Sequence, residues 1–191
     1  FADSVTFSGT SASTVEVASD ARLAIYLVDR PIPYSVRAAS GVTLDVRDTS
    51  SAANTNLNIY AGPIELDGNI NITGLAHTQQ SLHGPVSGSG GLTVISSELL
   101  LANTANDYSG PTVVSNGVLR PLTPAALSPA SALTVKNGGT LRLLSASTSA
   151  EGWTDADIAG VLTPSVFLDP TAKLGIDTSL RDVTLDAPLA D

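Results

Sequence analysis

The stretch from Ser87 to Leu143 constrains the fold most, because short apolar alternations recur in it with small polar turns between them. In each alternation two apolar side chains stand two residues apart, which places both on one face of a strand: Leu92 and Val94, Leu99 and Leu101, Leu133 and Val135, Leu141 and Leu143. The turns between them, such as Asn116-Gly117 and Asn137-Gly138-Gly139, use residues that accept a positive φ at low cost. The spacing leaves no room for helices between the strands. We therefore predict a chain of short strands that coils or meanders.

A longer motif runs through the same stretch. GSGGLT begins at Gly88, a Leu-x-Leu-x-Asn segment leads into Tyr-Ser-Gly-x-Thr-x-Val, and Asn-Gly-Val-Leu follows. Its residues are Gly88, Ser89, Gly90, Gly91, Leu92, Thr93, Leu99, Leu101, Asn103, Tyr108, Ser109, Gly110, Thr112, Val114, Asn116, Gly117, Val118 and Leu119. This order resembles the passenger-associated transport repeat of bacterial autotransporters and other surface proteins. The resemblance implies an all-β fold, a right-handed parallel β-helix displayed outside the cell, in which the repeat is scaffold and carries no catalytic residues.

The first half of the chain continues the strand rhythm. Val42, Leu44 and Val46 are predicted to point inward, while Asp45 points outward and pairs with other charges on the surface. Asp67-Gly68 fits either a two-residue hairpin or a corner of the helix, and the polar segment 74–84 is interpreted as a loop. Together the strands predict roughly eight coils.

Composition limits how such a chain can be stabilised. Of its 191 residues 42% are apolar but only 4% aromatic, so stacked Val, Leu, Ile and Ala must fill the interior. There is no Cys, which excludes disulfides and thiolate chemistry. With no Met and Phe1 as its first residue, we expect a processed or excerpted chain. No apolar run approaches the roughly 20 residues of a spanning helix, so we expect no membrane insertion.

The net charge of −9 makes nucleic acid and anionic lipid poor partners. We interpret this charge as favouring solubility outside the cell, with Ca²⁺ at contacts between subunits as the alternative. No cofactor is expected.

The pattern changes after Ser145. Thr154 is followed three residues later by Asp157, with Ile158, Val161 and Leu162 at helical spacing, which predicts one short α-helix opened by a capping box. We expect Trp153 to pack against this helix or to cover the end of the coil. The single domain divides into N-terminal coils (1–86), the motif-bearing repeat (87–144), a helical excursion or cap (145–165) and C-terminal strands (166–191). Two of these terminal residues, Val183 and Leu185, are candidates for an assembly strand.

Two loops are candidate contact surfaces. A proline-rich segment brings together Arg30, Tyr34 and Arg37, and a polar segment carries His77 and His83. The two histidines have no third ligand at a familiar metal spacing, so no metal site is predicted. The carboxylates along the strands scatter over different faces, whereas glycoside hydrolysis needs them to converge. We therefore expect no enzyme.

The resemblance and the absence of a catalytic pattern lead to one functional expectation. We expect a structural extracellular protein, a module of a bacterial surface fibre, layer or passenger scaffold that assembles with further copies of itself or with adjoining repeats. The alternatives are an adhesin whose loops bind a surface glycan and, third, a polysaccharide lyase or hydrolase.

Overall fold

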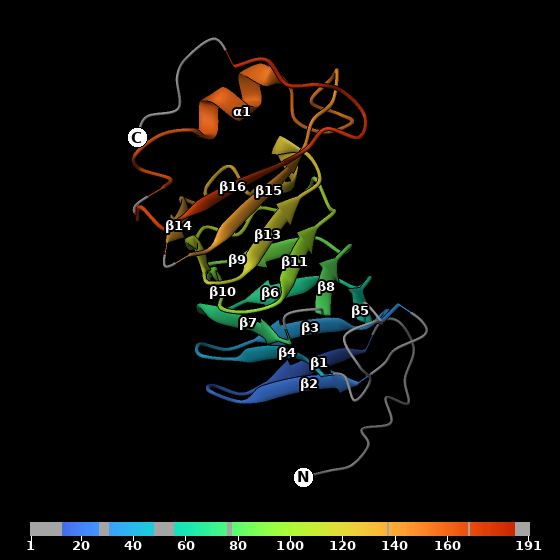
Figure 1. Ribbon diagram of the computed structural model, residues 1–191. Coiled ribbons are helices and arrows are strands. Elements are labelled where there is room, and N and C mark those ends of the chain that lie inside the picture. The colour runs from blue at the N-terminus through green and yellow to red at the C-terminus, as the bar shows by residue number, and fades with distance from the viewer. Residues whose placement is uncertain are drawn as a thin grey trace.

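The computed structural model is a parallel β-helix of about five turns with one short α-helix (Figure 1). The described residues are 13–26, 31–47, 56–75, 78–136, 138–167 and 169–185. The predicted fold class is confirmed. The expected count of roughly eight coils is wrong, because the longest described sheets contain six strands and the segment between β15 and β16 forms the helical excursion in place of further coils.

Three sheets form the faces of the solenoid, and each is entirely parallel. Sheet A contains, in spatial order, β1 (Thr14–Val17), β3 (Ser35–Ala38), β6 (Ile64–Leu66) and β9 (Val86–Gly88). Sheet B contains β14 (Leu133–Lys136), β12 (Thr112–Ser115), β10 (Leu92–Val94), β7 (Ile70–Gly74), β4 (Thr43–Arg47) and β2 (Arg22–Tyr26). Sheet C contains β16 (Lys173–Asp177), β15 (Thr140–Leu144), β13 (Val118–Pro121), β11 (Glu98–Leu101), β8 (Thr78–Leu82) and β5 (Asn56–Tyr60).

The register stacks equivalent side chains above one another in the interior. In sheet B one inward row, fully removed from solvent, consists of Leu44, Ile72, Val94, Val114 and Val135. In sheet C the corresponding row contains Leu99, Leu119 and Leu141, followed by Leu174. β-Branched and leucine side chains fit this arrangement because each packs against copies of its own shape. The predicted inward faces are therefore confirmed, including those of Val42, Leu44 and Val46.

The corners of the helix repeat as regularly as its strands. Gly62-Pro63 and Gly84-Pro85 occupy the same corner one coil apart, and a Cβ on Gly84 would lie 2.0 Å from the carbonyl oxygen of Gly62. Only glycine permits this close approach of successive turns. Asp67-Gly68 is also a corner, because β6 belongs to sheet A and β7 to sheet B. The hairpin alternative is thereby excluded.

Segment 74–84 is not the predicted loop, since it contains strand β8. Its Gln80 points into the core and donates from Nε2 to the carbonyl oxygens of Leu44 (3.0 Å) and Thr73 (2.9 Å). Asn58, its neighbour on β5, donates to the carbonyl of Ile25 at 3.3 Å. These buried amides tie sheet C to the carbonyls of sheet B, so a polar strand can face the interior. Sequence polarity alone therefore gave the wrong prediction.

Asp45 lies on the outer face of β4, as predicted, but it is buried and not solvated. Its carboxylate is 1% exposed, 3.2 Å from Nη1 of Arg22, and it accepts a 2.8 Å hydrogen bond from the Thr73 hydroxyl. Both partners stand on strands that flank β4. The predicted charge pairing is thus present, under a cover of neighbouring side chains.

The segment between β11 and β12, residues 102–111, takes the place of a sheet A strand. Asn106 accepts from the amide of Val86 (2.9 Å) and donates to the carbonyl of Ala126 (2.7 Å), which connects three successive coils. The Tyr108 hydroxyl is buried against Thr112 at 2.7 Å. Ala126 ends the short 3₁₀ turn η1 (Pro124–Ala126). Two residues of the motif, Tyr108 and Thr112, are therefore buried inside the coil.

The C-terminal end of the coil is covered by α1 (Asp155–Val161), which lies beyond β16 in Figure 1. Thr154 and Asp157 form the predicted capping box. Trp153 is buried at this end and donates from its indole nitrogen to the carbonyl of Pro121 at 3.0 Å, while Ile158 fixes the helix to the core. The prediction of a capped short helix is confirmed, and Trp153 covers the last coil.

The predicted C-terminal strands are only partly present. β16 is the last strand among the described residues, and Phe167 makes a single bridge to Val135. Val183 and Leu185 form no strand; they are partly buried in irregular chain that packs on the core. Their apolar side chains pack on the core as part of the cover at this end, and their backbone does not pair with a sheet strand.

We predict that Trp153→Ala lowers the free energy of unfolding by about 3–5 kcal/mol, because it empties the space under the cap and leaves the Pro121 carbonyl without its donor. Trp153→Phe keeps most of the apolar volume and should lose about 1–3 kcal/mol for the orphaned carbonyl. Urea unfolding monitored by circular dichroism measures both. Equal stability of wild type and Trp153→Ala would contradict the covering role.

The capping box should depend on pH. Partial burial opposes ionisation of Asp157, but hydrogen bonds from Thr154 and Ser149 outweigh it and hold the pKa of this carboxyl below its usual value. The charged cap therefore stabilises the fold fully above the unfolded pKa of about 3.9. This stabilisation is lost as the pH falls through the lower folded value.

We expect Asp157→Asn to cost about 0.5–1 kcal/mol at neutral pH, from the lost charge at the helix N-terminus. The difference from wild type should vanish in strong acid. Thermal unfolding of both proteins across the acid range measures it, and a difference independent of pH would contradict the assignment.

Candidate functional site

A shallow hollow of about 270 Å³ on the outer face of sheet C is the candidate functional site. The register of β13, β15 and β16 creates it. β13 and β15 are paired up to Leu119 and Leu141, so the next residues, Arg120 and Arg142, stand side by side. Arg142 in turn lies opposite Gly175 on β16. The row thus runs from two long cationic side chains to a position with no side chain.

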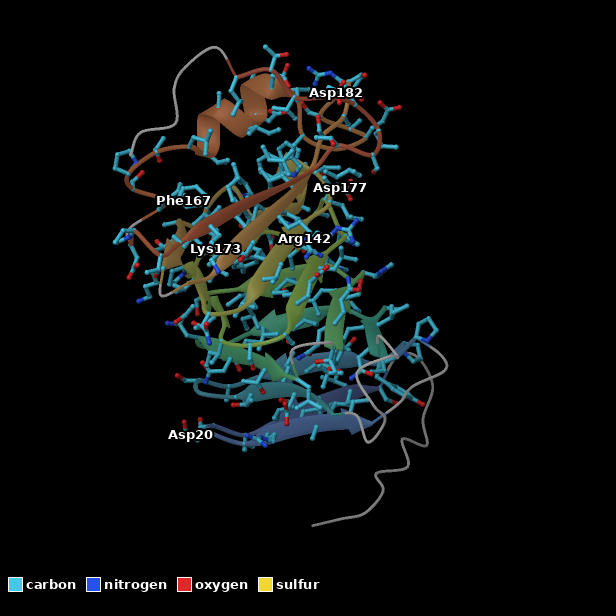
Figure 2. All side chains as sticks on the ribbon, in the orientation of Figure 1. Asp20, Arg142, Phe167, Lys173, Asp177 and Asp182 are labelled. Carbon is cyan, nitrogen blue, oxygen red and sulfur yellow. The ribbon has the colours of Figure 1, made fainter. Side chains whose placement is uncertain are left out.

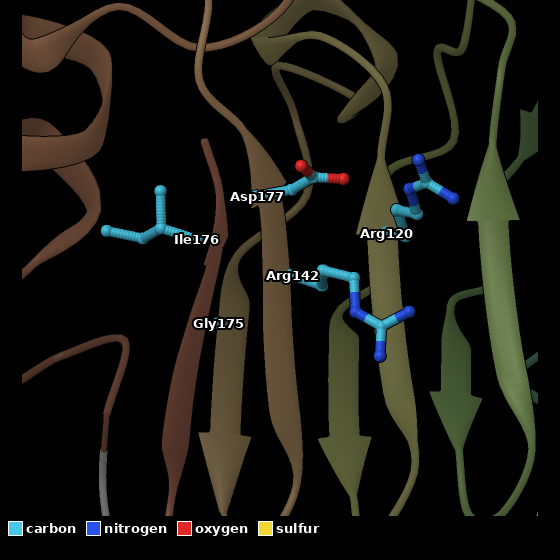
Figure 3. A pocket seen from close by; sticks show the side chains of 5 residues that line it. All are labelled: Arg120, Arg142, Gly175, Ile176 and Asp177. Atoms are coloured by element: carbon cyan, nitrogen blue, oxygen red, sulfur yellow. The ribbon is translucent and has the colours of Figure 1, made fainter. Parts of the chain in front are cut away.

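The lining combines charges of both signs. Arg120, Arg142, Gly175, Ile176 and Asp177 surround the hollow, and Figure 3 shows the two guanidinium groups and the Asp177 carboxylate on neighbouring strands. Lys173 shares the outer face of β16 with Asp177, and Figure 2 shows both near Arg142. Because strand residues two apart share a face, this charged surface follows directly from the alternation.

Glu98 on β11 holds the two arginines in place. Its carboxylate lies 2.7 Å from Nη1 of Arg142 and 3.9 Å from Nη1 of Arg120. Like charges on adjacent strands repel, so the Glu98 carboxylate offsets the repulsion between Arg120 and Arg142. Arg142 receives the closer contact, and Arg120 is held loosely.

Asp177 supplies a fixed negative charge at the rim. Hydrogen bonds from Ser179, and more weakly the fields of Arg120 and Arg142, hold the pKa of Asp177 below its ordinary value. The carboxylate is therefore charged throughout the neutral range and accepts hydrogen bonds. A general acid needs the opposite shift.

Arg120 keeps unused hydrogen-bonding capacity. Its Nε is shielded from solvent and has no hydrogen-bond partner. A guanidinium carries five N–H donors in a planar fork suited to carboxylates and other oxyanions. Because Nε is shielded, a ligand in the hollow reaches Arg120 through its Nη groups, of which Nη1 lies 3.9 Å from Glu98.

The predicted contact residues do not form one site. Tyr34 and His83 lie on the same corner, where the chain passes from sheet C to sheet A, with the turn at Gly62 stacked between them. Arg37 lies on the outer face of sheet A, bonded to Asp67 at 2.8 Å. Arg30 and His77 lie outside the described residues.

The hollow itself was missed from the sequence, although a signal for it exists. Arg120 and Arg142 each stand three residues after a glycine in matching segments, Gly117-Val-Leu-Arg and Gly139-Thr-Leu-Arg. When two turns are stacked, residues at the same distance after each turn lie on the same face of neighbouring strands. The position of Gly175 had no such signal, because the 33-residue step from Arg142 to Gly175 includes the helical excursion.

Metal ligands do not gather in the part of the chain that the structure describes: no group of three or more His, Asp or Glu side chains there is arranged to hold an ion. The same residues include no helix long and apolar enough to cross a membrane.

Comparisons with protein-family models, curated proteins and solved structures gave no match to this chain. The geometry of the hollow and of the two ends of the solenoid therefore supplies the functional argument.

We predict that Glu98→Gln destabilises the fold by about 1 kcal/mol at low salt, because the adjacent arginines lose their shared counter-charge. The loss should shrink at about 1 M salt, where the repulsion is screened. Glu65→Gln is the matched control. Glu65 is exposed and lies 3.8 Å from one arginine, Arg37, whereas Glu98 lies near two. Urea unfolding at both salt concentrations tests this, and equal effects of the two substitutions would contradict it.

Proposed function

We propose that this chain is a structural scaffold displayed outside the cell, and that it associates with a second copy through its N-terminal coil. The observation that carries the proposal is the difference between the two ends of the solenoid. One end is covered by α1 and Trp153, whereas at the other end the outermost strands among the described residues are β1 and β2. In Figure 2, Asp20 marks the N-terminal end and Asp182 the covered end.

Incomplete burial in the first coil supports this role for the N-terminal end. Val15 and Leu23 point inward but are only half-buried. Their register partners in the next coil, Val36 and Leu44, are 2% and 0% exposed. Apolar side chains at the end of a stack gain the same burial only when another layer covers them.

The outer backbone edges of β1 and β2 also support association through the N-terminal coil. Among the described strands, β1 pairs only with β3, and β2 only with β4. A strand paired on one side leaves a row of backbone N–H and C=O groups able to pair with another chain. A second copy supplies both an edge and an apolar layer of matching size.

The covered C-terminal end argues for a closed pair. If both ends were open, copies would stack head to tail and continue as a fibre. With one end covered, two copies meet through identical N-terminal coils, and such a self-complementary contact closes after two subunits. We propose this pair as the assembled form of the scaffold.

An extracellular place for this scaffold rests on the sequence. The chain resembles the passenger-associated transport repeat, has no Cys and carries a net charge of −9. Stability from continuous backbone pairing in place of disulfides suits a protein exposed outside the cell. We also propose that it acts by contact and not by catalysis, because both carboxylates beside the hollow already serve as partners of arginine or Ser179.

We expect Leu23→Lys to weaken self-association by at least about tenfold, because a half-buried lysine can keep its charge in water in the free subunit but not under a second coil. Leu180→Lys is the control, since Leu180 is 62% exposed in the C-terminal segment. Light scattering over a range of protein concentrations measures the pair. A protein that is monomeric throughout, or equal association of both variants, contradicts the proposal.

A further inference from the structure

We propose that the hollow on sheet C binds the carboxylate-bearing ring of an acidic sugar. Arg120 and Arg142 would bind the sugar carboxylate, and Asp177 would accept hydrogen bonds from the ring hydroxyls (Figure 3). The hollow lies on a lateral face of the solenoid, so sugar binding there does not depend on pairing through the N-terminal coil.

The two arginines favour an oxyanion between them. They stand on adjacent strands and share one carboxylate, Glu98, which contacts Arg142 at 2.7 Å but Arg120 only at 3.9 Å. Arg120 therefore has no close counter-charge on its guanidinium tip. A second carboxylate placed beside the Nη groups of Arg120 supplies one and relieves the repulsion between the two guanidiniums. Arginine and carboxylate match geometrically through paired hydrogen bonds.

Gly175 keeps the hollow open although the fold does not require a glycine there. A Cβ at this position would meet its nearest neighbours, Thr140 Cγ2 and Arg142 Cγ, at 3.8 and 3.9 Å, which is ordinary contact. Its φ is not among the positive values that disfavour other residues. A side chain at position 175 would therefore fit the strand and fill the hollow. The glycine matters for the open space beside Arg142.

The mixed charge selects a sugar acid over a polyanion. A dense row of phosphates or sulfates is repelled by Asp177 in the lining, by Glu98 behind the arginines and by the net charge of −9. A hexuronate offers one carboxylate to the arginines and neutral hydroxyl donors to Asp177. The volume of about 270 Å³ lies just below the roughly 300–1,000 Å³ of sites for drug-sized ligands, which suits a single sugar ring.

The test uses two probes that differ by one carboxylate. The ¹⁵N-labelled full chain is titrated with methyl glucuronide and with methyl glucoside, and amide shifts are followed. We expect saturable shifts for β13, β15 and β16 with the glucuronide, and at least about tenfold weaker binding of the neutral glucoside. Absent binding, or equal binding of both probes, overturns the proposal.

Three variants locate the site. Arg142→Gln and Gly175→Val should each weaken glucuronide binding at least about tenfold, while Arg37→Gln, which removes the same charge from sheet A, should leave it unchanged. The spectra themselves report whether each variant is folded. An Arg37→Gln loss equal to that of Arg142→Gln, or wild-type binding by Gly175→Val, overturns the site.

A titration with inorganic sulfate separates the sugar from a bare ion. Sulfate should bind more weakly than the glucuronide, because it cannot donate hydrogen bonds to Asp177. Sulfate binding as strong as that of the glucuronide, with the same amides shifted, overturns the assignment to an acidic sugar.

Discussion

Backbone pairing between successive coils is the constraint on which the rest of this structure depends. Leu92 pairs with Ile70, 22 residues earlier, and with Thr112, 20 residues later, so each coil is fixed by the coils on either side. This period leaves room for three short strands and three tight corners. It brings residues of one type into rows, which explains how an interior with few aromatic side chains is filled. It also explains the stacked glycines, because successive corners approach within van der Waals contact.

The same pairing gives the molecule two kinds of surface. The lateral faces have satisfied backbones, so their chemistry comes from the side chains that the rows bring together, as with Arg120, Arg142 and Glu98. Among the described residues, the strands at the two ends of the solenoid pair on one side only, so the apolar layer at each end gains burial from a cover. Trp153 and α1 provide one at the C-terminal end. At the N-terminal end Val15 and Leu23 are only half-buried, and we propose that a second copy covers them.

The sequence predicted what depends on local pattern. Alternation identified the inward side of most strands, and Thr154 with Asp157 identified the start of α1. Sequence pattern failed to predict the burial of residues whose environment depends on partners elsewhere in the fold. Gln80 enters the core because the carbonyl of Leu44, one coil earlier, and that of Thr73 on β7 accept its hydrogen bonds. Asp45 is buried because Arg22 and Thr73 cover it. The hollow depends on Gly175 reaching Arg142 after a 33-residue excursion, a register that no local pattern contains.

The most direct test of the open N-terminal coil is hydrogen exchange of the full chain at low and high protein concentration. Amides of β1 and β2 should exchange more slowly at high concentration, because pairing of two copies buries this edge. Amides of β16 and of α1 should be unaffected. Protection that does not change with concentration, or that increases at β16 instead, would contradict the account in which the C-terminal end is closed and the N-terminal coil is the contact surface.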